Sequence, residues 1–379
     1  MTLVTLTRRR AIAVLPAFFT ASCSIKNRGP VLALKTPGTP TMPLKEAAHG
    51  SGATFPDLVY QDLITEYLKG NPHAKLTYDP VGSEEGVRNF LRGHTDFAGC
   101  DWRLTPDEED ALVPGAAARR PHIYVPSVAG AVAPIYRFED TTPLLQFSPD
   151  ILAAIFQGDI RRWDDPAIAR ENAGVRLPKS EIKVVRRDDG SGTTYALTSF
   201  FKARRTAWRL GTGFRVQWPS FTMPATHSSG VAELVASTPN AIGYVEFSFA
   251  ADLRALRFGR VRNLMDQPVL AGIESVNKAL PKTLPPNPQE IARAIFETNV
   301  EDAYPIVSLT WVLAPLSPSA RSGELIKDFL SWAVGPDGRD RAKLLDYVPL
   351  NDALTDLALS EIQKIQPNTP ANGTNASAL

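Results

Sequence analysis

The segment Val-Val-Arg-Arg-Asp-Asp-Gly-Ser-Gly-Thr, residues 184–193, carries the clearest structural signal in this chain. The apolar and basic run at 182–186 predicts a strand, and the run at 193–204 predicts a helix. A turn rich in Gly and Ser joins them. The first N–H groups of a helix are unpaired and carry partial positive charge, so such a turn predicts an anion-binding loop.

Two more loops of this kind precede predicted helices, at residues 50–55 (Gly-Ser-Gly-Ala-Thr-Phe) and at Gly82-Ser83. Ser and Thr are the commonest helix caps, so each loop alone predicts only a capped helix. Three in one chain favour an anion site. The loop at 189–193 is neither Gly-Lys-Ser/Thr nor Gly-x-Ser-x-Gly, so nucleotide hydrolysis and serine hydrolase chemistry are poorly supported.

Helix and strand patterns alternate from about residue 50 onward, which predicts α/β layers with helices on both faces of the sheets. Apolar spacing predicts a helix from Phe55 that stops near Gly70, and another that carries Val87 and Phe90. The remaining predicted helices are 149–156, 193–204, 230–236, 288–297, 322–334 and 352–365. The predicted strands are 76–78, 96–100, 123–134, 182–186, 241–247 and 306–313.

Composition excludes several functional classes. The 379 residues predict two domains, and 44% hydrophobic with 21% charged residues is typical of soluble globular proteins. The 41 basic residues are balanced by 40 acidic ones, so the net charge gives no support to a nucleic-acid-binding surface. The five His are scattered and neither CxxC nor HExxH occurs, so we expect neither a metal site nor a cofactor.

The N-terminus predicts export. Thr7-Arg8-Arg9-Arg10 precedes an apolar run of about a dozen residues, so residues 1–23 are interpreted as a signal peptide of the Sec or twin-arginine type. Cys23 follows Ala21-Ser22 as in a bacterial lipoprotein cleavage site, although Thr20 departs from that motif. We therefore predict a periplasmic or cell-envelope protein with Cys23 as the candidate lipidation site.

The two ends of the mature chain are predicted to lie outside the folded part. Residues 24–48 are rich in Pro, Gly and Thr and predict an extended tether. Residues 367–379 predict a disordered tail. No apolar run of the mature chain is long enough for a membrane span, so membrane contact is expected only through a lipid anchor.

Several segments together resemble the periplasmic phosphate-binding proteins of bacterial ABC phosphate importers. The resemblance covers about residues 48–350 and implies a two-domain periplasmic-binding-protein fold of type II. Each domain is then a sheet flanked by helices, with the ligand in the interdomain cleft. Domain I would be 49–126 plus 306–366, and domain II 127–305. The matching segments are 50–56, 81–83, 96–101, 163–169, 184–193 and 241–246.

The same resemblance implies a set of phosphate ligands. Arg187 would supply a forked cation that suits a tetrahedral oxyanion, with Asp189 orienting it. Hydroxyl and backbone N–H donors would complete the shell. The full implied set is Thr54, Phe55, Ser83, Asp101, Arg187, Asp189, Ser191, Gly192 and Thr193.

Asp101 is the expected source of selectivity. An ionised carboxylate only accepts hydrogen bonds. Phosphate near neutral pH still carries a proton on oxygen, whereas sulfate carries none. We therefore expect Asp101 to accept from phosphate and to repel sulfate.

Three features depart from the family pattern. Glu84 and Glu85 follow Ser83, and we expect them to be solvated in a first helical turn or to pair with Arg88 or Arg186. Cys100 is expected to be a buried small residue without a disulfide partner. The stretch 222–230 lacks the usual Gly-Asn-Asp/Glu-Gly run, so no ligand contact is assigned to it.

The predicted function is capture of inorganic phosphate by an exported solute-binding protein. Hinge closure would deliver it to the permease and ATPase subunits of an ABC importer, without enzymatic chemistry. Two alternatives stay open. One is a phosphomonoesterase-like enzyme that would use the carboxylates of Asp101, Asp188 and Asp189. The other is a binding protein for arsenate, sulfate or another tetrahedral oxyanion.

Overall fold

The computed structural model describes residues 47–115, 120–140, 143–250 and 255–368. The chain divides into two compact units, Met1–Pro43 and Leu44–Leu379, and every described residue belongs to the second. The predicted signal peptide, Cys23 and most of the predicted tether therefore lie outside the described residues.

The folded part is slightly longer than predicted at both ends. Ala47 and Ala48, predicted to end the tether, begin the first strand and pair with Lys75 and Leu76. Asn368, predicted to lie in the tail, donates its backbone N–H to the Pro318 carbonyl at 3.0 Å. Both predictions were wrong at these positions because backbone pairing, which composition does not reveal, fixes them.

A mixed sheet of ten strands, counted over the described residues, runs through the molecule. Its strands follow the order β2-β1-β3-β12-β4-β8-β6-β7, and β13 and β9 both pair with β4. Their bounds are β1 Ala47–Gly52, β2 Lys75–Asp79, β3 Phe97–Cys100, β4 His122–Arg137, β6 Lys183–Arg187, β7 Met223–Ala225, β8 Ala241–Glu246, β9 Arg257–Phe258, β12 Val307–Pro315 and β13 Val348–Pro349. A small second sheet joins β5 (Gln146–Phe147), β10 (Arg260–Arg262) and β11 (Pro268–Val269).

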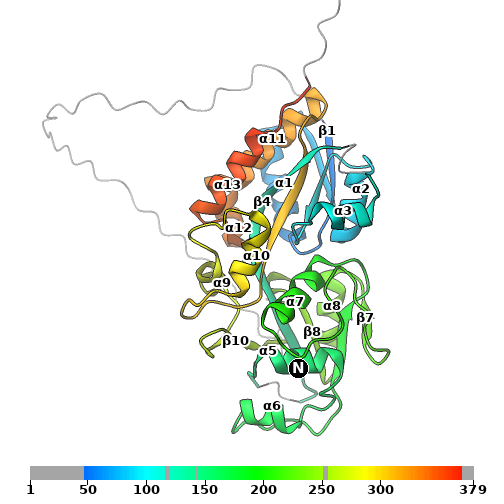
Figure 1. Ribbon diagram of the computed structural model, residues 1–379, viewed down its shortest axis with the longest axis vertical. Coiled ribbons are helices and arrows are strands. Elements are labelled where there is room, and N and C mark those ends of the chain that lie inside the picture. Colours follow the sequence, from blue (N-terminus) through cyan, green and yellow to red (C-terminus); the bar gives the residue numbers. More distant parts are fainter. Residues whose placement is uncertain (1–46, 116–119, 141–142, 251–254, 369–379) are drawn as a thin grey trace, which may run out of the picture. The chain divides into compact units, whose positions relative to one another are not determined.

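The long strand β4 connects two lobes. Its residues 122–131 pair with β12, and its residues 132–137 pair with β8, both antiparallel. We call the β2-β1-β3-β12 side of the sheet the first lobe and the β8-β6-β7 side the second lobe. Figure 1 shows β4 passing from one lobe to the other. The predicted division at 126/127 falls inside β4, and the division into independent domains stays a prediction.

Helices cover both lobes, which confirms the predicted α/β class (Figure 1). The first lobe carries α1 (Asp57–Gly70), α2 (Ser83–Leu91), α3 (Pro106–Leu112), α11 (Ala320–Val334), α12 (Pro336–Leu344) and α13 (Asp352–Gln363). The second carries α5 (Pro149–Gln157), α6 (Pro166–Glu171), α7 (Gly192–Ala203) and α8 (His227–Ser237). The remaining helical segments are η1 (Phe247–Ala250), α9 (Ile273–Ala279), η2 (Pro288–Glu290) and α10 (Ile291–Phe296).

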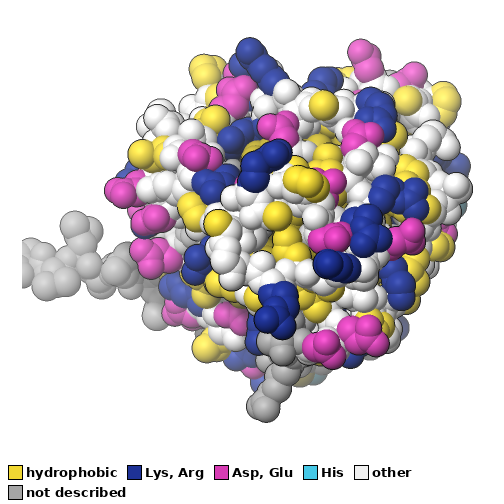
Figure 2. Space-filling model, turned by 90° about the horizontal axis from the view of Figure 1, so that it is seen from below, with side chains coloured by type: hydrophobic (Ala, Val, Ile, Leu, Met, Phe, Trp, Pro, Cys, Tyr) yellow, Lys and Arg dark blue, Asp and Glu magenta, His cyan; other side chains and the backbone are white. Residues whose placement is uncertain are grey.

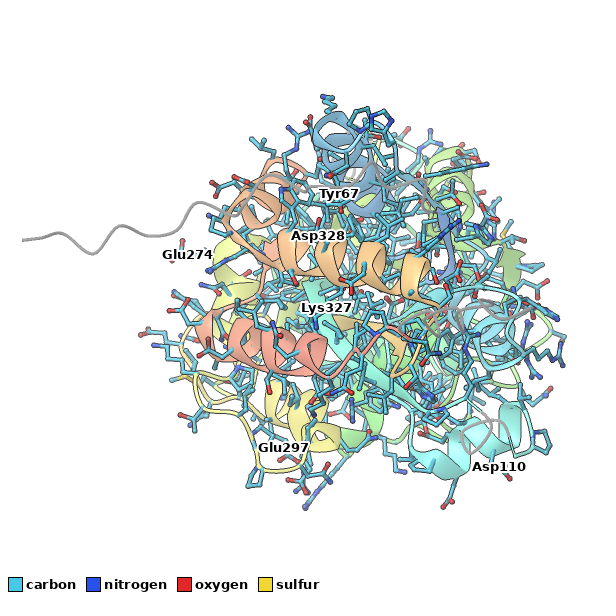
Figure 3. The ribbon with its side chains drawn as sticks, turned by 90° about the horizontal axis from the view of Figure 1, so that it is seen from above. Tyr67, Asp110, Glu274, Glu297, Lys327 and Asp328 are labelled. Atoms are coloured by element: carbon cyan, nitrogen blue, oxygen red, sulfur yellow. The ribbon has the colours of Figure 1, made fainter. Side chains whose placement is uncertain are left out.

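The two ends of the folded chain pack together in the first lobe. Helix α1 buries Val59, Leu63 and Tyr67, at the spacing of one helical face. The Tyr67 hydroxyl donates to Asp328 of α11 at 2.7 Å, across 261 positions of sequence. Lys327 donates to the Ile365 carbonyl at 3.1 Å, beyond the end of α13. Figure 3 shows Tyr67, Asp328 and Lys327 close to one another, so the C-terminal helices complete the lobe that the N-terminal strands begin.

The predicted loop at 50–55 is shorter in the structure, because Gly50, Ser51 and Gly52 lie in β1. A Cβ atom on Gly50 would lie 2.2 Å from the Phe97 ring, and one on Gly52 would lie 2.1 Å from the Gly99 carbonyl oxygen. These glycines therefore allow β1 to lie against β3, and only the residues after Gly52 form the loop.

Candidate functional site

Polar groups from both lobes meet where the lobes touch. The first lobe contributes the loop after β1, the N-terminus of α2 and the residue after β3. The second contributes the end of β6 and the N-termini of α7 and α8. A Cβ atom on Gly192 would lie 2.4 Å from Ser83 Oγ and 2.7 Å from Asp101 Cβ, and Thr54 Oγ1 lies 3.1 Å from Ser228 Oγ. The structure thus brings the residues predicted from separate loops into one place.

Arg187 supplies a buried positive charge with a fixed orientation. Arg187 is the last residue of β6 and is 3% exposed. Nε donates to Asp189 Oδ1 at 2.7 Å, Nη2 also donates to Asp189, and Nη1 donates to Ser228 Oγ at 3.3 Å. Since a guanidinium has five N–H donors, one donor on each terminal nitrogen is left for another partner. Such a fork suits an oxyanion.

Asp189 holds the Arg187 guanidinium in place. Besides Arg187, it accepts the backbone N–H of His227 at 3.1 Å. Burial alone would raise the pKa of Asp189, but the hydrogen bond and the positive charge of Arg187 outweigh it and lower the pKa overall. Asp189 is therefore ionised, and the pair anchors the end of β6 to the N-terminus of α8.

Asp101 faces this cation from the first lobe and is 3% exposed. Thr310 Oγ1 donates to its Oδ1 at 2.8 Å, and Ser83 Oγ lies 3.4 Å from its Oδ2. Burial raises the pKa of Asp101 to about 7, although the bond from Thr310, the charge of Arg187 and Ser83 act in the opposite direction. At neutral pH the carboxyl group therefore exchanges between a protonated form, which can donate a hydrogen bond, and an ionised form, which can only accept one.

The N-terminus of α7 supplies further donors. Ser191 caps this helix, accepting the Thr194 N–H at 3.1 Å, so its own hydroxyl proton can point elsewhere. Among the described residues, the buried hydroxyl of Thr193 has no hydrogen-bond partner. Buried polar groups are almost always paired, so this hydroxyl is available to a group that the described residues do not supply.

Three supporting residues were missed by the sequence analysis. Ser228 lies in the stretch to which no contact was assigned, yet it links Thr54 to Arg187. Thr310 is one of two buried polar residues, with Ser308, in the mostly apolar strand β12, a signal that could have pointed to a buried partner. The Tyr244 hydroxyl accepts the Arg187 backbone N–H at 3.3 Å and pairs with the Thr194 hydroxyl at 2.7 Å.

The acidic pair after Ser83 behaves differently at its two positions. Glu85 is exposed, as expected for a first helical turn. Glu84 accepts from Arg88 at 2.7 Å, which confirms that expectation, and also from Arg215 at 2.7 Å, which was not foreseen. Arg186, the alternative partner, instead pairs with Asp188.

Three further observations concern the described residues alone. Cys100 is buried with a free thiol, which donates to the Trp102 carbonyl at 3.0 Å, as predicted for a small core residue. Within the described ranges, no three His, Cys, Asp or Glu side chains come close enough to hold a metal ion. In that same part of the chain, no helix combines the length and apolar character that a membrane crossing needs.

Comparison with known proteins places this geometry in a family. Residues 37–337 match the model of the PBP superfamily domain. The chain is 31% identical to the phosphate-binding protein PstS of Pasteurella multocida over 84% of this chain and 88% of that protein. It is 28% identical to PstS of Methanocaldococcus jannaschii over 83% and 85% of the two chains.

Solved structures support the fold. The phosphate-binding protein from Stenotrophomonas maltophilia superimposes with a TM-score of 0.65 at 23% identity, over 83% of this chain and 93% of that one. A high-affinity periplasmic phosphate-binding protein, PfluDING, solved with bound phosphate, gives the same values. These likenesses confirm the predicted periplasmic-binding-protein fold of type II.

Proposed function

This chain belongs to the PBP superfamily and, within it, to the PstS family of phosphate-binding proteins, and from that premise we propose that it captures inorganic phosphate at the contact between its lobes. The observation that carries the proposal is that one site contains both a buried, oriented guanidinium, that of Arg187, and a buried carboxyl group, that of Asp101. The cation attracts the anion, and the carboxylate requires the bound oxygen to carry a proton.

We propose that nine residues form the phosphate shell. Arg187 and the hydroxyl and N–H donors contact the negative oxygens, Asp101 accepts the phosphate O–H, and Asp189 orients Arg187. Support comes from their convergence and from the unpaired hydroxyl of Thr193. The set is Thr54, Phe55, Ser83, Asp101, Arg187, Asp189, Ser191, Gly192 and Thr193.

Calorimetric titration of the processed protein tests the proposal. Phosphate, sulfate and arsenate are titrated separately, in the presence of a metal chelator. We expect saturable binding of one phosphate and much weaker binding of sulfate. Arsenate carries a similar proton and is expected to compete. Absence of phosphate binding, or preference for sulfate, would contradict the proposal.

We propose that binding draws the lobes together and that the closed form is recognised by the permease and ATPase subunits of an ABC importer. Support comes from β4, which pairs with β12 of the first lobe through residues 122–131 and with β8 of the second lobe through residues 132–137, so that this one strand joins the two lobes. The protein then acts by binding and release alone. Figure 2 shows basic and acidic side chains interspersed on one face, in keeping with a near-neutral chain.

We propose that Cys23 anchors the exported protein to the membrane by lipid. Replacing Cys23 with Ser is expected to move the protein from the membrane fraction to the soluble fraction, because a bacterial lipoprotein carries several acyl chains and stable anchoring needs more than one. Fractionation followed by immunoblotting measures this. Cys100→Ser is the matched control and should fractionate like the parent. An unchanged distribution of the Cys23 variant would rule lipidation out.

A further inference from the structure

We propose that Glu84 and Arg215 form an ionic latch between the lobes, which slows the release of bound phosphate. The inference rests on the proposed function for its ligand, but the latch can also be observed without ligand. Glu84 belongs to the first turn of α2 in the first lobe. Arg215 belongs to the second lobe, in the segment between α7 and β7.

The ion pair joins the two lobes directly. Arg215 Nε donates to Glu84 Oε2 at 2.7 Å, and Arg215 Nη1 donates to the Asp188 carbonyl at 2.7 Å. Glu84 is 13% exposed at its side chain and Arg215 is 59% exposed, so solvent screens the pair only in part. The guanidinium thus ties helix α2 to the loop that follows β6 and contains Asp188 and Asp189.

Close packing makes this contact sensitive to any separation of the lobes. The Glu84 backbone N–H donates to the Gly190 carbonyl at 3.1 Å. A Cβ atom on Gly190 would lie 2.3 Å from Glu84 Cβ and 2.2 Å from its Oε2. Because Glu84 lies directly on the loop of the other lobe, any separation of the lobes breaks the hydrogen bond and the ion pair together.

The charges explain how an acid can be tolerated beside an anion site. Burial alone would raise the pKa of Glu84, but the bonds from Arg88 and Arg215 and their charges lower it overall, so the group is ionised. Two guanidinium groups offset one carboxylate. Removing Arg215 therefore has two costs: it opens the latch and it leaves Glu84 less compensated near the phosphate. Removing the charge of Glu84 opens the latch but leaves no uncompensated carboxylate near the phosphate.

This asymmetry predicts an order of effects. Arg215→Gln is expected to raise the phosphate dissociation rate about tenfold, and Glu84→Gln about threefold, values on the scale of a partly exposed charge network. The phosphate dissociation rate of the double variant should equal that of Glu84→Gln, and should not be raised by the product of the two single effects. Added salt should speed release from the parent and have little effect on the variants, since salt weakens ion pairs.

Arg209→Gln is the matched control. Arg209 lies in the same segment as Arg215 and makes an ion pair with Asp159 at 2.6 Å, but both of these residues belong to the second lobe. Its removal should leave the dissociation rate unchanged. Stopped-flow release with a phosphate-trapping chase measures all four variants. The latch is excluded if Arg215→Gln releases phosphate at the parent rate, or if Arg209→Gln has the same effect.

A second measurement separates the latch from the proposed function. Dyes attached through Leu344→Cys in the first lobe and Arg176→Cys in the second, both exposed positions, report lobe separation by energy transfer without phosphate. Adding Glu84→Gln or Arg215→Gln should shift the lobes apart. If the parent fails to bind phosphate but this shift occurs, the proposed ligand is wrong and the latch stands. If phosphate binds and neither readout moves, the latch is wrong.

Discussion

Replacing Arg187 with alanine is expected to weaken phosphate binding by roughly 10²–10⁴-fold, the scale of truncating one partner of a buried charge pair. Arg187 is 3% exposed, and its guanidinium keeps one N–H on each terminal nitrogen after bonding Asp189 and Ser228. A water molecule that filled the space of the missing guanidinium would carry no positive charge, so it could not restore the attraction for the anion. Calorimetric titration of parent and variant measures the effect.

The same change also destabilises the fold, because Asp189 keeps its buried charge and loses its partner. Breaking a buried pair on one side costs about 3–5 kcal/mol of unfolding free energy. The double variant Arg187→Ala/Asp189→Ala removes both charges and should recover much of that stability. It should still fail to bind phosphate. Thermal unfolding of both variants separates lost binding from lost folding.

The neighbouring arginine is the control for this prediction. Arg186 pairs with Asp188, which is 57% exposed at its side chain, and thus lies outside the buried shell. Arg186→Ala should bind phosphate like the parent. If Arg187→Ala binds within tenfold of the parent, or if Arg186→Ala loses as much, the cation of the site has been misassigned.

The second-lobe part of the site was predictable because its residues lie close together in the sequence. Arg187, Asp189 and Ser191 lie within five positions, so the loop geometry alone brings them together. Ser228 and Thr310 come from distant segments, and only the packing of α8 and β12 places them at the site. No local pattern carries that information, since a serine in a first helical turn usually acts as a cap.

The same distinction holds for the fold. Long periodic helices such as α11 and α13 were predicted to within a few residues, because burial of one face imposes the spacing. The short helices α3 and α6 were missed, since one or two turns carry little periodicity. Part of strand β1 was interpreted as a loop because glycines are common in turns. Here the glycines instead allow β1 to lie close to β3.

Asp101→Asn is expected to reduce the preference for phosphate over sulfate, with a gain for sulfate of about 1–3 kcal/mol, the cost of one unsatisfied buried group. The ionised carboxylate offers only lone pairs, so it faces sulfate with repulsion. Asn has almost the same volume and offers N–H donors as well as an acceptor. Phosphate binding should change less, because a charged acceptor is lost while repulsion between anions is relieved.

The raised pKa of Asp101 adds a dependence on pH. Burial raises it to about 7, above the usual range, so the folded protein holds a proton where the unfolded chain has lost it. The stability that this proton contributes is present at low pH and is lost as pH rises through about 7.

Sulfate is the cleaner probe of this titration, because sulfate itself does not take up a proton near neutral pH. Below about pH 7 the protonated Asp101 can donate to sulfate, and above it the carboxylate repels sulfate. Sulfate affinity of the parent should therefore fall as pH rises through that midpoint. The Asn variant should show no such fall, since its side chain does not titrate.

Competition titrations of phosphate and sulfate at pH values about one unit on either side of the midpoint test both expectations. Asp188→Asn is the matched control, because Asp188 lies in the same loop as Asp189 but is largely exposed and paired with Arg186. It should leave both the anion ratio and its pH dependence unchanged. If the ratio does not move in Asp101→Asn, or if sulfate affinity of the parent is independent of pH, another group discriminates between the anions, and the oxyanion that the protein serves must be assigned anew.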